Sequence, residues 1–486
     1  MTPSPRIRDL AIRIVAAAIL SIGLGARGTA AEPLPEPRES LPAPCDVALE
    51  NGIDPAAVAV GAGGCATASC HGGPQAGNHD VRTFSAALWA TRDPHSRAYE
   101  TLHGPRSRRM AAMLGIGEPH RARQCLVCHA SQAAVETPLS PGVLADGVAC
   151  GSCHGDATRW LTVHTLPEWK HLDGPARAEL GYRDLADVGA RVRTCIPCHV
   201  GDASREVDHD LLAAGHPRLA FEFAAYERLW PRHWSPRGRA ESQSDFAARS
   251  WAAGQAEVVA AVARLLAVRA RRAAETAAED RLALEPPPRA RWPEFAEFDC
   301  YSCHRPLSPE RVAAAAGGEF RNPAPGTPSW QPWTTAAASL LSAAVAEPAV
   351  ARVGPAAADL RDALRPAWSS ADQAQLIRVI TRAELLEQAA DAAARGIAAQ
   401  RLVTLDASPE RLDTLVFANR PEWRSWDAAA QTYLLMEAAA APSARGRAAL
   451  DSLRNGLRFP PGAGGPDRFD PTEFERDRAA VPRPGR

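Results

Sequence analysis

Apolar residues recur at steps of three and four along much of the chain, with polar residues on the opposite faces. This period predicts amphipathic helices. Six segments show it: 250–278, 334–347, 359–364, 371–400, 426–440 and 444–457. No segment shows the strong alternation expected of a strand. The pattern therefore predicts a mainly α protein with little regular sheet.

The N-terminus has the pattern of a secretory signal. Three arginines within the first 13 residues precede an apolar run over 14–24, which is too short to span a bilayer. Thr29 and Ala31 are small and suit cleavage before Glu32. An uncleaved anchor is the alternative. We expect a signal peptide over 1–31 and a mature protein in the periplasm, an oxidising compartment.

Cysteine and histidine divide the rest of the chain. Ten of the eleven cysteines and all fourteen histidines lie between residues 61 and 307. The expected organisation is a Pro-rich linker over 32–60, a Cys/His domain over 61–310, a helical domain over 325–458 and a disordered tail over 459–486.

The sequence Cys-x-x-Cys-His occurs four times in the Cys/His domain, and an expanded copy precedes these four. The copies are Cys65-Cys70-His71 (expanded), Cys125-Cys128-His129, Cys150-Cys153-His154, Cys195-Cys198-His199 and Cys300-Cys303-His304. Two thiols at this spacing reach the two vinyl groups on one porphyrin edge, and the next residue places an imidazole on the iron. The sequence thus predicts five covalently attached c-type haems, each with a proximal histidine.

Other uses of paired cysteines fit less well. Composition alone gives about 0.007 expected copies of the short motif, so four are not accidental. Zinc sites do not require a histidine after every second cysteine, and disulfides leave these histidines unexplained. Cys45 lies outside the motifs. A free thiol is the simplest interpretation of Cys45, and a Cys45–Cys65 disulfide, which would leave the first haem on Cys70 alone, is the alternative.

The second axial ligands must come from the histidines outside the motifs. His95 follows Asp93-Pro94, which predicts a rigid helix start. His164 lies ten residues after a motif and can fold back onto a neighbouring haem. His209 and His216 are seven apart and would share one face if their segment is helical, roughly 10 Å apart. These four are the candidate distal ligands.

The other histidines outside the motifs give weaker signals. They are His79, His103, His120, His171 and His233. We expect His79 and His171 to be solvated, whereas His103, His120 and His233 remain open. Met110 and Met113 are further possible ligands, but methionine on a helix more often packs against its neighbours.

Four segments carry a resemblance to the multihaem cytochrome c-554 family, which is more distantly related to hydroxylamine oxidoreductase. They are 93–99, 146–155, 208–218 and 298–304. The resemblance covers roughly 61–307 and implies closely stacked haems that carry electrons. It also implies mostly two-histidine irons, with distal roles for His95, His164, His209 and His216. The chain departs from the family in having five motifs, so the extra haem has no ligand implied by it.

Three functional hypotheses follow. Haems packed along a short chain pass electrons without chemistry on a substrate, and this favours an electron-transfer protein with no catalytic residue. The alternative is a redox enzyme acting on a small nitrogen or sulfur compound at one five-coordinate haem. In the third, the C-terminal helices dock redox partners, such as a membrane quinol oxidoreductase or another cytochrome, or form a homo-oligomer. The net charge of −1 argues against a nucleic-acid partner.

Overall fold

The computed structural model describes residues 60–73, 81–131, 141–234, 243–279, 292–300, 329–367, 372–400, 402–408, 411–412, 425–439, 444–458 and 469–481. Within these ranges the chain is mainly helical, with turns between the helices. The β pairing there is limited to the isolated bridges Asp202–Arg205, Phe298–Trp330 and Val345–Leu405. The prediction of a mainly α protein is therefore confirmed. The signal segment, the linker, Cys45, His79, Cys303 and His304 lie outside the described residues.

Contacts divide the described chain into two compact units. One contains residues 60–194 and 230–234, and the other contains residues 195–229 together with the described chain from 243 onward. This division differs from the expected boundary near residue 310. The last two haem motifs begin in the same unit as the C-terminal helices.

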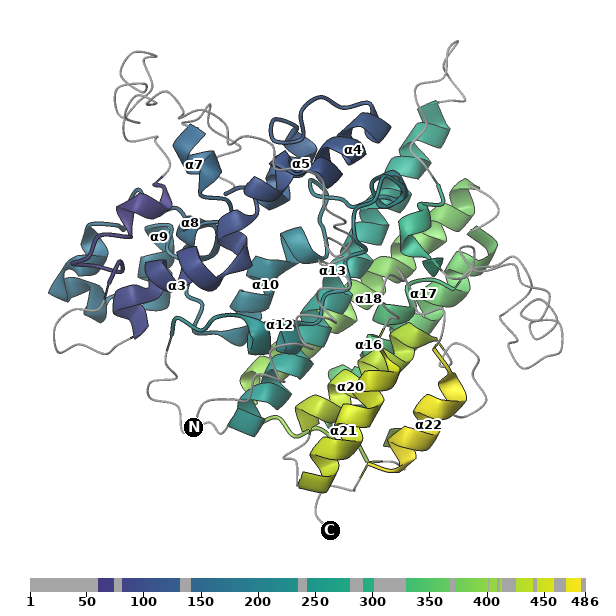
Figure 1. Cartoon of the computed structure of the whole chain (residues 1–486). Helices are drawn as coiled ribbons and strands as arrows, with labels where there is room; N and C mark the ends of the chain where they lie inside the picture. The colour runs from purple at the N-terminus through teal and green to yellow at the C-terminus, as the bar shows by residue number, and fades with distance from the viewer. Residues whose placement is uncertain are drawn as a thin grey trace, which may run out of the picture. The chain divides into compact units, whose positions relative to one another are not determined.

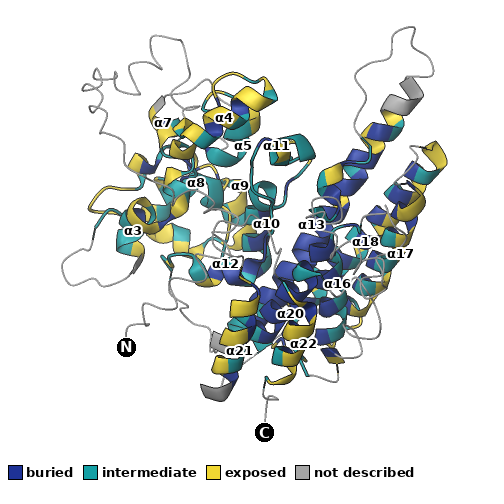
Figure 2. Cartoon of the chain, turned by 45° about the vertical axis from the view of Figure 1, so that its right-hand side comes forward, coloured by how far each residue is buried: buried dark blue, intermediate teal, exposed yellow. Residues whose placement is uncertain are grey.

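The unit that contains the C-terminal helices is built around α13 (Gln243–Glu279). Between Ala252 and Ala270 this helix carries mostly Ala, Val and Leu, and nearly all of these side chains are buried. Figure 2 shows α13 in dark blue along most of its length. Asp245–Glu275 is long and apolar enough to cross a membrane, and 89% of its apolar window is buried inside the protein.

The same unit contains further helices. They are α11 (His209–Ala213), α12 (Phe223–Leu229), α16 (Pro332–Ala344), α17 (Val353–Ala367), α18 (Gln373–Ala399), α20 (Trp426–Ala439), α21 (Ala444–Gly456) and α22 (Pro471–Ala479), with the 3-10 turns η8 (Phe295–Glu297) and η9 (Val350–Arg352). The most extensive contact joins α13 and α18, which run side by side in Figure 1. α20 is buried almost throughout because it packs on both α13 and α16.

Two expectations for this region need correction. The short helix expected over 359–364 is part of the longer α17. The tail expected to be disordered contains α22. Asp470 caps α22 by accepting hydrogen bonds from the backbone N–H groups of Thr472 and Glu473, and Phe474 is buried. A cap and one buried aromatic therefore order a segment whose composition indicates disorder.

The other unit is made of short helices separated by turns. They are η2 (Ala62–Gly64), η3 (Val81–Phe84), α3 (Ser85–Arg92), η4 (Pro94–Arg97), η5 (Glu100–His103), α4 (Pro105–Leu114), α5 (Arg123–His129), α7 (Pro141–Ala145), α8 (Cys150–His154), η6 (Val163–Thr165), η7 (Pro167–His171) and α9 (Gly174–Glu179). α10 (Val188–His199) begins in this unit, and its last residues belong to the other. Few large apolar side chains of residues 60–194 are buried, so side chains alone make only a small core there.

Candidate haem sites

Three of the motifs occupy the ends of helices. α5, α8 and α10 each finish at the motif histidine, His129, His154 and His199 respectively. In a helix, residues three and four apart lie on one face. The two thiols and the imidazole of each motif therefore point to the same side, as attachment to one porphyrin requires.

The expanded motif has a different local structure. Cys65 caps η2, and the following residues to His71 form turns rather than a helix. The Cys65 thiol lies against Cys150 of another motif, and a hydrogen bond with Cys150 lowers the pKa of Cys65 to about 7. The same contact raises the pKa of Cys150. The first and third motifs are therefore spatial neighbours.

The hydrogen bonds of the histidine rings test whether these side chains suit an iron. Backbone carbonyl oxygens accept from Nδ1 of four rings: His71 (Arg82 O, 2.7 Å), His129 (Ala98 O, 2.9 Å), His164 (Leu161 O) and His216 (Pro217 O, 2.8 Å). A carbonyl can only accept, so Nδ1 carries the proton and the lone pair is on Nε2. This is the arrangement of metal-binding histidines, and these residues fit haem iron.

His71 and His164 form one ring pair, with centroids 6.4 Å apart and planes inclined by 12°. Two imidazoles bound through Nε2 at about 2 Å on opposite sides of one metal have centroids roughly 6.3 Å apart. The spacing therefore fits one iron between the proximal His71 and the predicted distal ligand His164. Trp160 and Trp169 flank His164 edge-on.

His154 and His233 form a second pair, with centroids 6.3 Å apart and planes inclined by 72°. Burial, together with His233, His71 and Arg183, lowers the pKa of His154 to about 4, and burial also lowers the pKa of His233. Both rings are therefore neutral near pH 7, as iron binding requires. His233 was not among the four predicted distal ligands, since its sequence context, Pro-Arg-His-Trp, gives no clear signal.

His95 lies where the sequence predicts, at the start of η4, which Asp93 caps. Nδ1 of His95 donates to Asp93 Oδ1 at 2.8 Å, and Asp93 Oδ2 accepts from Trp230 Nε1 at 2.6 Å. Burial alone would raise the pKa of Asp93, but the contacts with His95 and Trp230 lower it overall. A buried carboxylate thus fixes the orientation of the His95 ring through Nδ1.

The predicted pair His209 and His216 does not share a helical face. α11 ends at Ala213, and Gly215 follows with φ +113°, a backbone conformation that leaves the helix. The backbone N–H of His209 donates to Glu294 Oε1 at 2.8 Å, and its ring meets Phe295 edge-on. The shared-face expectation is therefore wrong, because glycine ends the helix before His216.

The histidine of the fourth motif, His199, packs against aromatic side chains, and charged residues line a cavity next to it. The ring of His199 stacks on Phe221 and meets Tyr226 edge-on, with centroids 5.2 Å away in both cases. A cavity of about 60 Å³ begins at the next residue, Val200, and is also lined by Phe221, Arg218 and Arg269. Both arginines are already paired with carboxylates of the protein, Arg218 with Asp427 and Arg269 with Glu206 and Glu297.

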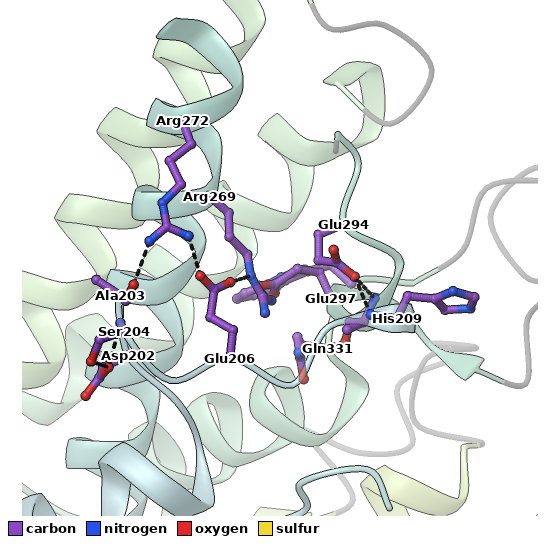
Figure 3. A network of polar contacts seen from close by, with 12 residues as sticks. Asp202, Ala203, Ser204, Glu206, His209, Arg269, Arg272, Glu294, Glu297 and Gln331 are labelled. Atoms are coloured by element: carbon purple, nitrogen blue, oxygen red, sulfur yellow. Dashed lines mark hydrogen bonds and ion pairs between the residues drawn. The ribbon is translucent and has the colours of Figure 1, made fainter. Parts of the chain in front are cut away.

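A charged network borders this cavity (Figure 3). The buried Arg269 binds Glu297 Oε1 through Nη1 at 2.6 Å and Glu206 Oε2 through Nε at 2.8 Å. Burial disfavours the charged guanidinium, but Glu297 and Glu206 raise the pKa of Arg269 above its ordinary value. Trp330 Nε1 donates to the second oxygen of Glu297 at 3.0 Å. Arg269 of α13 thus ties together Glu206, three residues before His209, and Glu297 of η8.

The remaining described histidines are not placed as a pair around an iron. The rings of His103 and His120 stack at 4.3 Å, which is too close for one metal between them. His171 is exposed, as expected. Within the described chain, His129 makes no ring contact with another imidazole. Met113 is 62% exposed.

Residues 65–155 match the family model described as cytochrome c554 and c-prime. The predicted resemblance is therefore confirmed over this segment, which holds the first three motifs and His95. No curated protein and no solved structure matches the chain. The matched family implies c-type haems and electron transfer, while the last two motifs and the C-terminal helices lie outside the matched residues.

Proposed function

We propose that the chain is an exported cytochrome that carries five c-type haems and transfers electrons between redox proteins. The observation that carries the proposal is the pair of ring spacings, His71–His164 and His154–His233. Bound haem iron supplies a one-electron redox centre. An iron with two histidine ligands has no open position for a substrate, which favours electron transfer over catalysis.

The protein's own residues would do three things in this role. The ten motif cysteines bind the porphyrin edges, and His71, His129, His154, His199 and His304 bind the iron on the proximal side. His164 and His233 are the proposed distal ligands on the irons of His71 and His154. His95, His209 and His216 are proposed for the other haems. Carbonyl and carboxylate acceptors orient the rings.

The neighbouring thiols of Cys65 and Cys150 support a short route between two of the haems. Thioether bonds at adjacent thiols would bring the attached porphyrin edges close together. Electrons would then pass between these haems without a diffusing carrier.

Two further parts of the proposal concern the setting. A signal peptide over 1–31 would deliver the protein to the periplasm, where haem attachment and an oxidising environment are compatible. We propose a membrane quinol oxidoreductase or another cytochrome as the redox partner. The C-terminal helices are the proposed contact for a second copy of the chain.

The first test is the mass and the EPR spectrum of the full-length mature protein. The mass should exceed that of the polypeptide by five haems, and at least three haems should give low-spin signals. His164→Ala and His233→Ala should each convert one low-spin haem to high-spin with the haem count unchanged. His171→Ala, at an exposed histidine, is the control and should leave the spectrum as it was.

Mostly high-spin iron in the unmodified protein would overturn the proposal, as would a spectrum insensitive to both distal substitutions. A high-spin signal that shifts on adding nitrite, hydroxylamine or nitric oxide would instead support a redox enzyme with one open haem.

A further inference from the structure

Asp93 is placed to act on an iron through His95. Its Oδ1 accepts hydrogen bonds from the His95 ring at 2.8 Å and from the His95 backbone N–H at 3.0 Å. Its Oδ2 accepts from Trp230 Nε1 at 2.6 Å, and the side chain is buried. Both oxygens are therefore engaged, and the carboxylate has one fixed orientation toward the ring.

The acceptor at His95 differs in kind from the acceptors at four other histidine rings. His71, His129, His164 and His216 donate from Nδ1 to neutral backbone carbonyls. His95 donates to a carboxylate, and hydrogen bonds to ionised groups are roughly twice as strong as neutral ones. A carboxylate behind a ligating imidazole also raises the basicity of that ligand.

Building on the proposed function, we propose that Asp93 is a positioning residue that makes His95 a stronger donor than the histidines held by backbone carbonyls and lowers the reduction potential of the one haem that His95 binds. A stronger donor and a nearby negative charge both favour ferric over ferrous iron. Trp230 moderates the effect, because its N–H shares the negative charge of the same carboxylate.

The test is spectropotentiometry of the full-length protein carrying its haems, with wild type compared with Asp93→Asn. The amide keeps a side-chain oxygen that can accept from His95 but removes the charge. The reduction potential of one haem should rise by at least about 59 mV. For a one-electron couple this is a tenfold change in the equilibrium constant for electron exchange with the other haems. The potentials of the others should not move.

Two further variants separate this role from a merely structural one. Trp230→Phe keeps the aromatic packing but removes the hydrogen bond to Asp93, so the same haem should shift in the opposite direction, to a more negative potential. Asp173→Asn is the matched control. Asp173 caps α9 by accepting from the N–H of Ala176 at 2.9 Å, as Asp93 caps η4, but it is exposed and bonds to no imidazole in the described structure. No haem should shift in that variant.

The outcomes distinguish this inference from the proposed function. His95→Ala should convert one low-spin haem to high-spin. If it does and Asp93→Asn shifts no potential, or shifts all of them equally, the role of Asp93 is refuted while the cytochrome proposal stands. If His95→Ala leaves every haem low-spin, His95 is not a ligand and the proposed ligand set fails at that residue. Shifts of the same sign in Asp93→Asn and Trp230→Phe would also refute the positioning role.

Discussion

At the scale of single residues, the sequence predicts a side chain's position only where neighbouring residues determine it. The position of His95 could be predicted because a cap and a following proline act within a few residues of the ring. The pairing of His233 with His154 could not, because the fold brings the two segments together and neither sequence context encodes it. The seven-residue spacing of His209 and His216 does not show that the chain leaves the helix at Gly215, where φ is positive.

Glu222 gives a prediction at the same scale. It is 3% exposed, and its two oxygens accept from the backbone N–H groups of Ala224 (3.0 Å) and Ala225 (2.7 Å). Burial nevertheless raises its pKa to about 7, from 4.5. The folded state therefore holds this proton more tightly than the unfolded state, and Glu222 makes folding less favourable as pH rises from 4.5 to 7.

Replacing this carboxyl by an amide should remove that dependence. The free energy of unfolding of Glu222→Gln minus that of wild type should rise by about 3 kcal/mol between pH 4 and pH 8. Denaturant unfolding at the two pH values measures it. An equal difference at both pH values for Glu222→Gln would contradict the prediction.

At the scale of elements, periodicity succeeds where a helix has one buried face. α18 and α21 begin and end within about two residues of the expected segments, as capping and fraying allow. The pattern underestimates α17, because Gly354 and Pro366 suggest helix breaks near its two ends. The N–H of Gly354 instead donates to Ser342 Oγ at 2.7 Å, a tertiary contact that sequence periodicity cannot show.

The close packing of α12 and α13 depends on a glycine, Gly254, at their contact. A Cβ at Gly254 would lie 2.7 Å from the Cβ of the buried Phe223. Gly254→Ala should therefore destabilise the protein by about 1–3 kcal/mol through overpacking, although alanine is the better helix former by about 1 kcal/mol. Thermal unfolding measures this, and Gly174→Ala, where a Cβ would meet no atom within 4 Å, is the control. An unchanged or higher melting temperature for Gly254→Ala would show that the helices can move apart freely.

On the scale of the whole molecule, the domain boundary expected from composition differs from the boundary that the contacts give. Cysteine and histidine end near residue 307, which suggested a boundary there. Contacts instead join 195–229 to the C-terminal helices. The buried Asp427 of α20 binds Arg218 at 3.0 Å, and Trp333 Nε1 of α16 donates to the backbone of Phe221 at 3.2 Å. Such contacts between distant segments are invisible in composition.

Truncation tests this joint unit. A chain ending after residue 310 lacks α16, α18 and α20, which pack on α13, so it would expose apolar side chains of α13 to water. We expect residues 195–310 of that chain to lose helix content and become sensitive to protease, as measured by circular dichroism and limited proteolysis. A chain ending after residue 481 should behave as the full length does. Full protease resistance of the shorter chain would mean that the C-terminal helices are dispensable for folding.

The contact between Cys65 and Cys150 has a consequence for biogenesis. These thiols belong to different motifs, yet they are neighbours in the folded chain, and the pKa of Cys65 is lowered to about 7. A partly ionised thiol beside a second thiol is readily oxidised to a disulfide. In the periplasm that we propose, a chain that folds before it receives its haems would cross-link these two cysteines and block both attachment sites. Haem ligation at the first and third motifs would therefore compete with a disulfide between these two cysteines once this unit has folded.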